Sequence, residues 1–161
     1  MEQENTKIAL VLFFSFGLVQ ANILPTPKMQ DAQKDLAEWA KEVGIGVCSD
    51  QRYFELSPTM STCTKEKQTE LQNGMASTKV CSLIDPFLQC MDPLEECYTT
   101  QEINRFMRAN LQIIIEYMKF VNKEAGARLE NCQQYKDLAS RGSAITGINM
   151  GIIIVIFTIV A

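Results

Sequence analysis

The chain contains no histidine. Histidine is the side chain whose ordinary pKa lies nearest neutral pH, and it supplies the base of Ser-His and Cys-His catalytic pairs and most catalytic zinc ligands. Its absence removes these arrangements and leaves a carboxylate pair or a Ser-Lys arrangement as the remaining routes to catalysis. We therefore expect a protein that is not an enzyme.

Three further signals are missing. The chain has no Asn-x-Ser/Thr sequence, so N-glycosylation is not predicted, and no Cys-x-x-Cys sequence of the kind that holds zinc. It has no excess of positive charge, with 15 Lys and Arg against 19 Asp and Glu, so no nucleic-acid partner is expected. No stretch alternates apolar and polar residues between hairpin turns, which argues against a sheet.

The N-terminal segment is typical of a secretory signal peptide. Lys7 is followed by an apolar run that ends at the small residue Ala21, and an extended sequence with two prolines comes next. Glu2 and Glu4 make its start less basic than usual, and an uncleaved membrane anchor is the alternative. We expect residues 1–21 to be removed.

The C-terminal segment is uncharged and short. Ile152–Ala161 gives ten uncharged residues, nine of them apolar, whereas a membrane-spanning helix needs about 20 and is normally followed by Lys or Arg. Small residues followed by a spacer and an apolar tail are typical of a glycosylphosphatidylinositol (GPI) anchor signal. We expect residues 143–161 to be removed and Gly142 to carry the anchor, with Ser143 and Ser140 as alternative attachment residues. A short transmembrane span and a buried C-terminal helix are the other interpretations.

Residues 22–142 then form one extracellular domain on the outer face of the plasma membrane. An even number of cysteines in an oxidising compartment predicts three disulfides. A structural zinc site is the alternative, but it would require short paired spacings with Cys or His partners. The six cysteines are Cys48, Cys63, Cys81, Cys90, Cys97 and Cys132.

Apolar residues recur at three- and four-residue steps through most of this domain, which predicts an all-α fold of four to five helices in a small bundle. Ser57 and Pro58 have the residue types of an N-cap and a first helical position, so a helix is expected to begin there. Gly126 is expected to end the longest helix. The predicted helices are 28–47, 57–73, 80–91, 100–124 and 128–138.

The pairing of the cysteines follows from a predicted antiparallel hairpin between the second and third helices. Cys63 and Cys90 lie about equally far from its turn and should face each other. Cys81 and Cys90 would be about 13 Å apart on a continuous helix, which is too far for a disulfide. Cys97 and Cys132 lie beyond opposite ends of the fourth helix, and these ends are about 37 Å apart, so a disulfide between them is disfavoured. The remaining pairs, Cys81–Cys132 and Cys48–Cys97, are a guess among 15 connectivities.

The acidic residues after Cys81 are the candidates for a carboxylate or calcium site. They are Asp85, Asp92, Glu95 and Glu96. A simpler interpretation is that Asp92 caps a helix that Pro93 begins, with Glu95 completing a capping box. Because Pro93 and Leu94 interrupt any series of oxygen ligands, neither a metal nor a cofactor is expected.

The fourth helix has two adjacent apolar stripes, and their function has two interpretations. They could be the centre of a packed core, or Phe106, Met107, Ile114 and Met118 could line a lipid-sized pocket. We expect a recognition or adhesion module held at the cell surface by a lipid anchor, with an unknown extracellular protein partner. The alternative is a carrier of an apolar ligand, and a small hydrolase is third.

Overall fold

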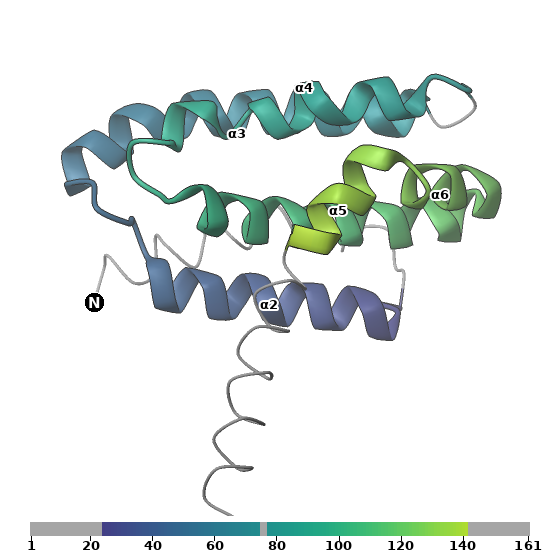
Figure 1. The fold of residues 1–161 in the computed structure, drawn as a ribbon, viewed down its shortest axis with the longest axis horizontal. Coiled ribbons are helices and arrows are strands. Elements are labelled where there is room, and N and C mark those ends of the chain that lie inside the picture. Colours follow the sequence, from purple (N-terminus) through teal and green to yellow (C-terminus); the bar gives the residue numbers. More distant parts are fainter. Residues whose placement is uncertain (1–23, 75–76, 142–161) are drawn as a thin grey trace, which may run out of the picture.

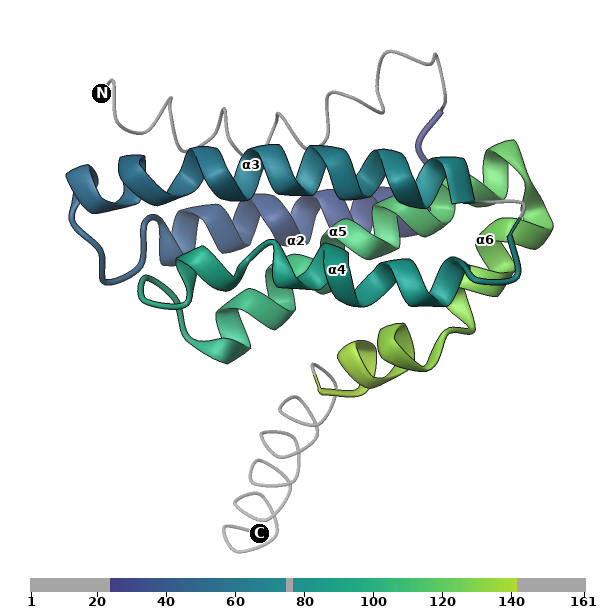
Figure 2. The ribbon, with the colours of Figure 1, turned by 90° about the horizontal axis from the view of Figure 1, so that it is seen from above.

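The computed structural model in Figures 1 and 2 describes residues 24–74 and 77–141. Within these ranges the chain is helical and contains no strand, so the predicted all-α fold is confirmed. None of the helices in these ranges is both long and apolar enough to cross a bilayer. The predicted signal peptide 1–21, the attachment residues Gly142 and Ser143, and the segment 143–161 lie outside the described residues. Ser140 lies inside them and is exposed.

Helix α2, Pro27–Val43, follows the pattern expected for its sequence. Thr26 caps it by accepting a hydrogen bond from the backbone N–H of Met29 at 3.2 Å, and Pro27 takes the first position. The helix ends before Gly44 rather than at Val47 as predicted, because Gly44 and Gly46 turn the chain with positive φ angles of 58° and 64°. Val47 is consequently 87% exposed.

Helix α3, Asp50–Asn73, begins about two helical turns before the predicted start at Ser57. Its N-cap is Ser49, whose hydroxyl accepts from the backbone N–H of Arg52 at 3.3 Å. Pro58 lies inside the helix, where it removes one backbone donor without ending the helix. The predicted C-terminus is correct, since α3 ends at Asn73 and is followed by Gly74.

The predicted helix 80–91 is divided into shorter pieces. Val80–Leu83 forms the 3₁₀ helix η2 and Ile84–Gln89 forms α4. A second 3₁₀ helix, η3, Asp92–Leu94, follows the predicted range. Pro86 explains the division, because it has no N–H for the carbonyl four residues earlier and its ring would collide with that carbonyl. The apolar pattern was nevertheless informative, since its side chains are buried: Val80, Ile84, Phe87 and Met91.

Helix α5, Thr100–Val121, starts as predicted but ends earlier. Asn122 adopts an extended conformation and caps a new helix, α6, Lys123–Glu130. Gly126 does not end α5. It is buried in α6, where an added Cβ would lie 2.4 Å from Cγ and 2.5 Å from the backbone nitrogen of Lys119, so glycine permits close packing of α6 on α5. A final helix spans residues 133–141, and the predicted helix 128–138 is therefore interrupted.

The helices fall into two groups, called layers below, and α5 lies between the pair of α3 and α4 and helix α2 (Figures 1 and 2). Helices α3 and α4 run side by side in one layer, and α2 and α5 pack against each other in the other, with α6 folded back on α5. The core lies around α5, which buries ten of its 22 residues. The indole N–H of Trp39 in α2 donates to the backbone carbonyl of Glu102 in α5 at 2.8 Å, which fixes the contact between these two helices.

Three disulfides cross-link the helices. Cys63–Cys90 joins α3 to the end of α4, and Cys81–Cys132 joins η2 to the segment after α6. Cys48–Cys97, Cys63–Cys90 and Cys81–Cys132 have Cα–Cα distances of 4.8, 5.5 and 5.4 Å. Cys63–Cys90 is the pair that the hairpin argument favours, and the other two are the pairs that remained as a guess. Intramolecular disulfides persist in oxidising compartments, so they are consistent with a secreted or extracellular protein.

Candidate functional site

The four residues predicted to line an apolar pocket lie in the core of the domain. Phe106, Met107, Ile114 and Met118 are 4, 2, 3 and 0% exposed. The ring of Phe106 packs against that of Trp39 with their centroids 4.8 Å apart. These side chains therefore contribute to the packing between α5 and its neighbours.

The predicted acidic cluster does not converge on one point. Asp85, Asp92, Glu95 and Glu96 are all exposed, and Glu96 accepts hydrogen bonds from Arg52 at 2.6 and 3.0 Å. The expected capping box at Asp92 is wrong, because η3 has no side-chain cap. The capping box belongs to α5, where Thr99 and Glu102 exchange bonds of 3.2 and 2.8 Å. Among the described residues, no group of three or more Cys, Asp or Glu side chains could hold a metal ion.

An open cleft of about 440 Å³, with charged residues in its lining, lies where α2, α5 and helix 133–141 meet. No expectation from the sequence pointed to this cleft, although its α2 residues follow the spacing of a single helix face. The cleft is lined by Lys28, Asp31, Ala32 and Asp35 from α2, by Arg108, Ala109 and Gln112 from α5, and by Tyr135 and Ala139. None of the predicted pocket residues is among them.

Next to the cleft, Asp35 takes part in arginine–carboxylate pairs. Arg105 joins Asp35, at 2.8 Å, to Glu42, at 2.6 Å. Burial alone would lower the pKa of Arg105, but its hydrogen bonds with these two carboxylates outweigh that effect and raise the pKa. Arg108 contacts the other carboxylate oxygen of Asp35 at 3.5 Å. Asp35 is thus held in place mainly by Arg105.

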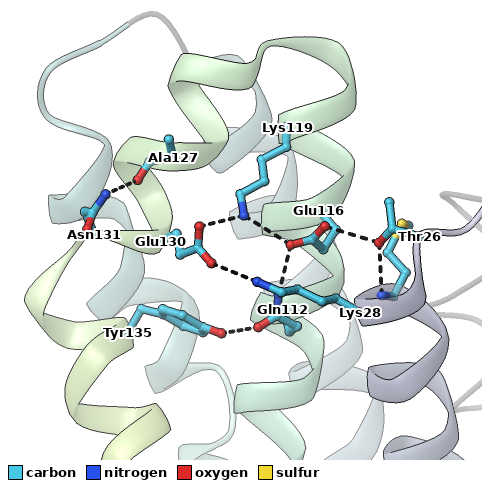
Figure 3. A network of polar contacts seen from close by, with 10 residues as sticks. Thr26, Lys28, Gln112, Glu116, Lys119, Ala127, Glu130, Asn131 and Tyr135 are labelled. Carbon is cyan, nitrogen blue, oxygen red and sulfur yellow. Dashed lines mark hydrogen bonds and ion pairs between the residues drawn. The ribbon is translucent and has the colours of Figure 1, made fainter.

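A carboxylate network centred on Glu116 also lies next to the cleft (Figure 3). Although buried, Glu116 accepts from the hydroxyl of Thr26, the amide of Gln112 and the ammonium of Lys119, each at 3.2 Å. Lys119 also contacts Glu130 at 2.6 Å, and this hydrogen bond lowers the pKa of the Glu130 carboxyl. The network ties together α2, α5 and α6.

Tyr135 extends this network into the cleft. Its hydroxyl donates to the side-chain oxygen of Gln112, whose amide in turn donates to Glu116 (Figure 3). Burial raises the pKa of Tyr135, so the phenol remains protonated at neutral pH. Both polar groups of Gln112 are occupied, which fixes the wall of the cleft.

Charged groups in the cleft, among them Asp31 and Arg108, keep unused bonding capacity. Asp31 is exposed and makes no ion pair or side-chain hydrogen bond within the described part of the chain. Arg108 has the single 3.5 Å contact with Asp35, although a guanidinium carries five N–H donors. The arrangement can bind charged groups.

Comparison with models of protein families, with curated proteins and with solved structures finds no match for this chain.

Proposed function

We propose that the chain is a recognition or adhesion module, displayed on the extracellular face of the plasma membrane by a GPI anchor, and that it catalyses no reaction. One observation carries the proposal: the charged groups with unused bonding capacity face outward in a fixed cleft, whereas the apolar side chains of α5 are buried. A binding surface needs this arrangement, because outward polar groups on a rigid framework bind without a large ordering cost.

The carrier alternative has less support. A carrier would need the apolar face of α5 to surround a cavity, and the residues expected to do so are instead core residues with at most 4% exposure. The hydrolase alternative lacks a base, since the chain has no histidine and its acidic residues around position 92 are exposed and separate.

Two treatments of intact cells test the proposal. Phosphatidylinositol-specific phospholipase C should release the protein, because the anchor would be its only attachment to the membrane. The released protein is then biotinylated on the anchor glycan, which leaves Lys28 unmodified, and assembled into tetramers. These tetramers should bind cells saturably. Excess unlabelled protein should compete with that binding.

The outcomes separate the alternatives. A protein that stays on the membrane and retains residues beyond 151 by mass spectrometry would show a transmembrane span instead of a lipid anchor. Released protein that binds no cells but carries stoichiometric lipid within the fold would contradict the recognition module and support the carrier. The readout for the lipid is native mass spectrometry before and after organic extraction.

A further inference from the structure

The cleft between α2, α5 and helix 133–141 is neutral overall but strongly polarised. Its lining contains two cationic side chains, Lys28 and Arg108, and two anionic ones, Asp31 and Asp35. Asp35 is already engaged by Arg105 at 2.8 Å. Lys28 and Arg108 each make one ionic contact of 3.5 Å within the described residues, to Glu130 and to Asp35, so both keep unused N–H donors. The unused capacity is therefore cationic at Arg108 and at the more exposed Lys28, and anionic at Asp31.

Arg108 supplies the cationic half. Its side chain is 29% exposed, and its one ionic contact is the 3.5 Å approach to Asp35, whose nearer interaction is with Arg105. Most of its N–H donors are therefore available to an incoming oxyanion. A planar guanidinium pairs with carboxylate or phosphate through two parallel hydrogen bonds, which makes these groups its preferred ligands.

Asp31 supplies the anionic half, and the packing of α2 on α5 brings it close to Arg108. The contacts Thr26–Glu116 and Asp35–Arg105 set an antiparallel register between the two helices. Asp31 lies between Thr26 and Asp35 on α2, and so it is level with the part of α5 just past Arg108. Alanines 32, 109 and 139 complete the lining, and their small side chains leave the space between the two charges open.

The shape and lining also limit the kind of cation. A quaternary ammonium is normally held by aromatic faces, but Tyr135 is the one aromatic residue in this lining and its hydroxyl is bonded to Gln112. A carboxylate such as that of Asp31 suits a primary ammonium, which donates hydrogen bonds. The volume of about 440 Å³ lies within the usual range for small-molecule sites, roughly 300–1,000 Å³.

We infer that this cleft binds a small zwitterion, with its primary ammonium on Asp31 and its carboxylate or phosphate on Arg108. The inference rests on the proposed recognition function, for which it names the ligand. Two sources share this chemistry: a free α-amino acid and a phosphoethanolamine group, either free or on a lipid.

The test is isothermal titration calorimetry of the full chain, produced in a eukaryotic secretory system and purified in detergent. The probes are L-alanine and O-phosphoethanolamine. The matched compounds each lack one of the two binding groups: acetate and phosphocholine lack a primary ammonium, and ethylamine lacks a carboxylate or phosphate. At least one zwitterion should bind, and each matched compound should bind about tenfold or more weakly, since it forfeits a charged hydrogen bond. Flotation with vesicles containing phosphatidylethanolamine, against phosphatidylcholine alone, separates a lipid headgroup from a free ligand.

Variants locate the site. Asp31→Asn and Arg108→Gln should each weaken binding of the preferred zwitterion by about tenfold or more, and Arg108→Lys should retain part of the affinity because it keeps the charge. Arg52→Gln removes a surface arginine that pairs with Glu96 outside the cleft and should leave the affinity unchanged. Equal melting temperatures would show that the variants are folded, and a variant that fails this check is replaced by its isosteric or charge-conserving partner.

Failure of this inference can be told apart from failure of the proposed function. If neither zwitterion binds at millimolar concentration, or if Asp31→Asn and Arg108→Gln leave binding unchanged, the inference is wrong even if the tetramers still bind cells. If the zwitterion binds as expected but the tetramers bind no cells, the inference holds and the proposed recognition of cells is wrong.

Discussion

The two longest helices of this domain are stabilised in different ways. Helix α3 has 24 residues but buries four of them, Ser57, Met60, Thr64 and Leu71. Helix α5 has 22 residues and buries ten. Burial of apolar side chains is the main favourable term in folding, so α5 has the larger share of it and α3 needs another source of stability.

The disulfides supply that source. Cys48 lies just before α3, Cys63 lies within it, and Cys81 lies in η2 just after it, and each is bonded to a residue outside the helix. The cross-links therefore hold α3 near its start, at its middle and beyond its end. Packing therefore contributes most to α5, whereas α3, with fewer buried residues, relies more on its cross-links.

The largest effect should come from truncating the packed layer. Leu111→Ala in α5 removes a fully buried side chain and should reduce the free energy of unfolding by about 3–5 kcal/mol. Leu71→Ala in α3 removes an equally buried side chain, but we expect a loss nearer about 2 kcal/mol, because the more exposed layer can relax into the cavity. Chemical denaturation of the oxidised protein measures both. A larger loss for Leu71→Ala would contradict the comparison.

Removing one disulfide should have the next largest effect. The Cys63–Cys90 bond closes a loop with a sequence separation of 27, worth at most about 3.5 kcal/mol by chain entropy. The double variant Cys63→Ala, Cys90→Ala should lose on the order of 2–3 kcal/mol in denaturation, with faster proteolysis of α3 than of α5. Peptide mapping of the unmodified protein is the control. A direct Cys81–Cys90 bond there would overturn the pairing.

Acid should weaken the α5–α6 contact. The pKa of Glu130 is lowered in the folded protein, chiefly by its hydrogen bond with Lys119. Its contribution is therefore present above the ordinary glutamate pKa of about 4.3 and is lost as the pH falls through the lower folded value. The loss should be under about 1 kcal/mol, since the site is partly exposed. Melting temperatures from pH 6 to pH 3 measure it. Glu130→Gln should remove this part of the pH dependence, and an unchanged profile would count against the Lys119 contact.

The smallest effects concern helix caps. Thr99→Ala removes half of the capping box of α5 and should cost about 1 kcal/mol of unfolding free energy. Asp92→Asn should change it by less than about 0.5 kcal/mol, because η3 has no side-chain cap and Asp92 is exposed. Thermal denaturation compares the two. A greater loss for Asp92→Asn would restore the capping role that the sequence suggests for it.

Long apolar periodicities predicted the helices well, whereas local signals for caps and breaks were less reliable. The stripe of α5 is long enough that its burial could be expected from Ile103 to Met118. Ser57 and Pro58 resemble a helix start, but Ser49 provides a complete cap earlier and the helix continues through Pro58. Asn122 ends α5 without glycine, and nothing in its sequence neighbourhood distinguishes it from an ordinary helical asparagine.

The cleft could not have been predicted from one sequence. Lys28, Asp31 and Asp35 share a face of α2, which the spacing shows, but a charged helix face usually lies in solvent. What makes it a cleft is the approach of Tyr135 from the end of the chain, over a hundred residues away from Lys28. That approach depends on the turn after α6 and on the Cys81–Cys132 bond, and both are tertiary features.

Hydrogen exchange of each helix, measured on the oxidised protein and again after gentle reduction, tests the contrast between the two layers most directly. We predict that amides of residues 50–73 lose protection on reduction while those of residues 100–121 keep most of theirs, because α5 contains no cysteine and is held mainly by its buried side chains. Loss of protection in residues 100–121 before or together with residues 50–73 would contradict the account.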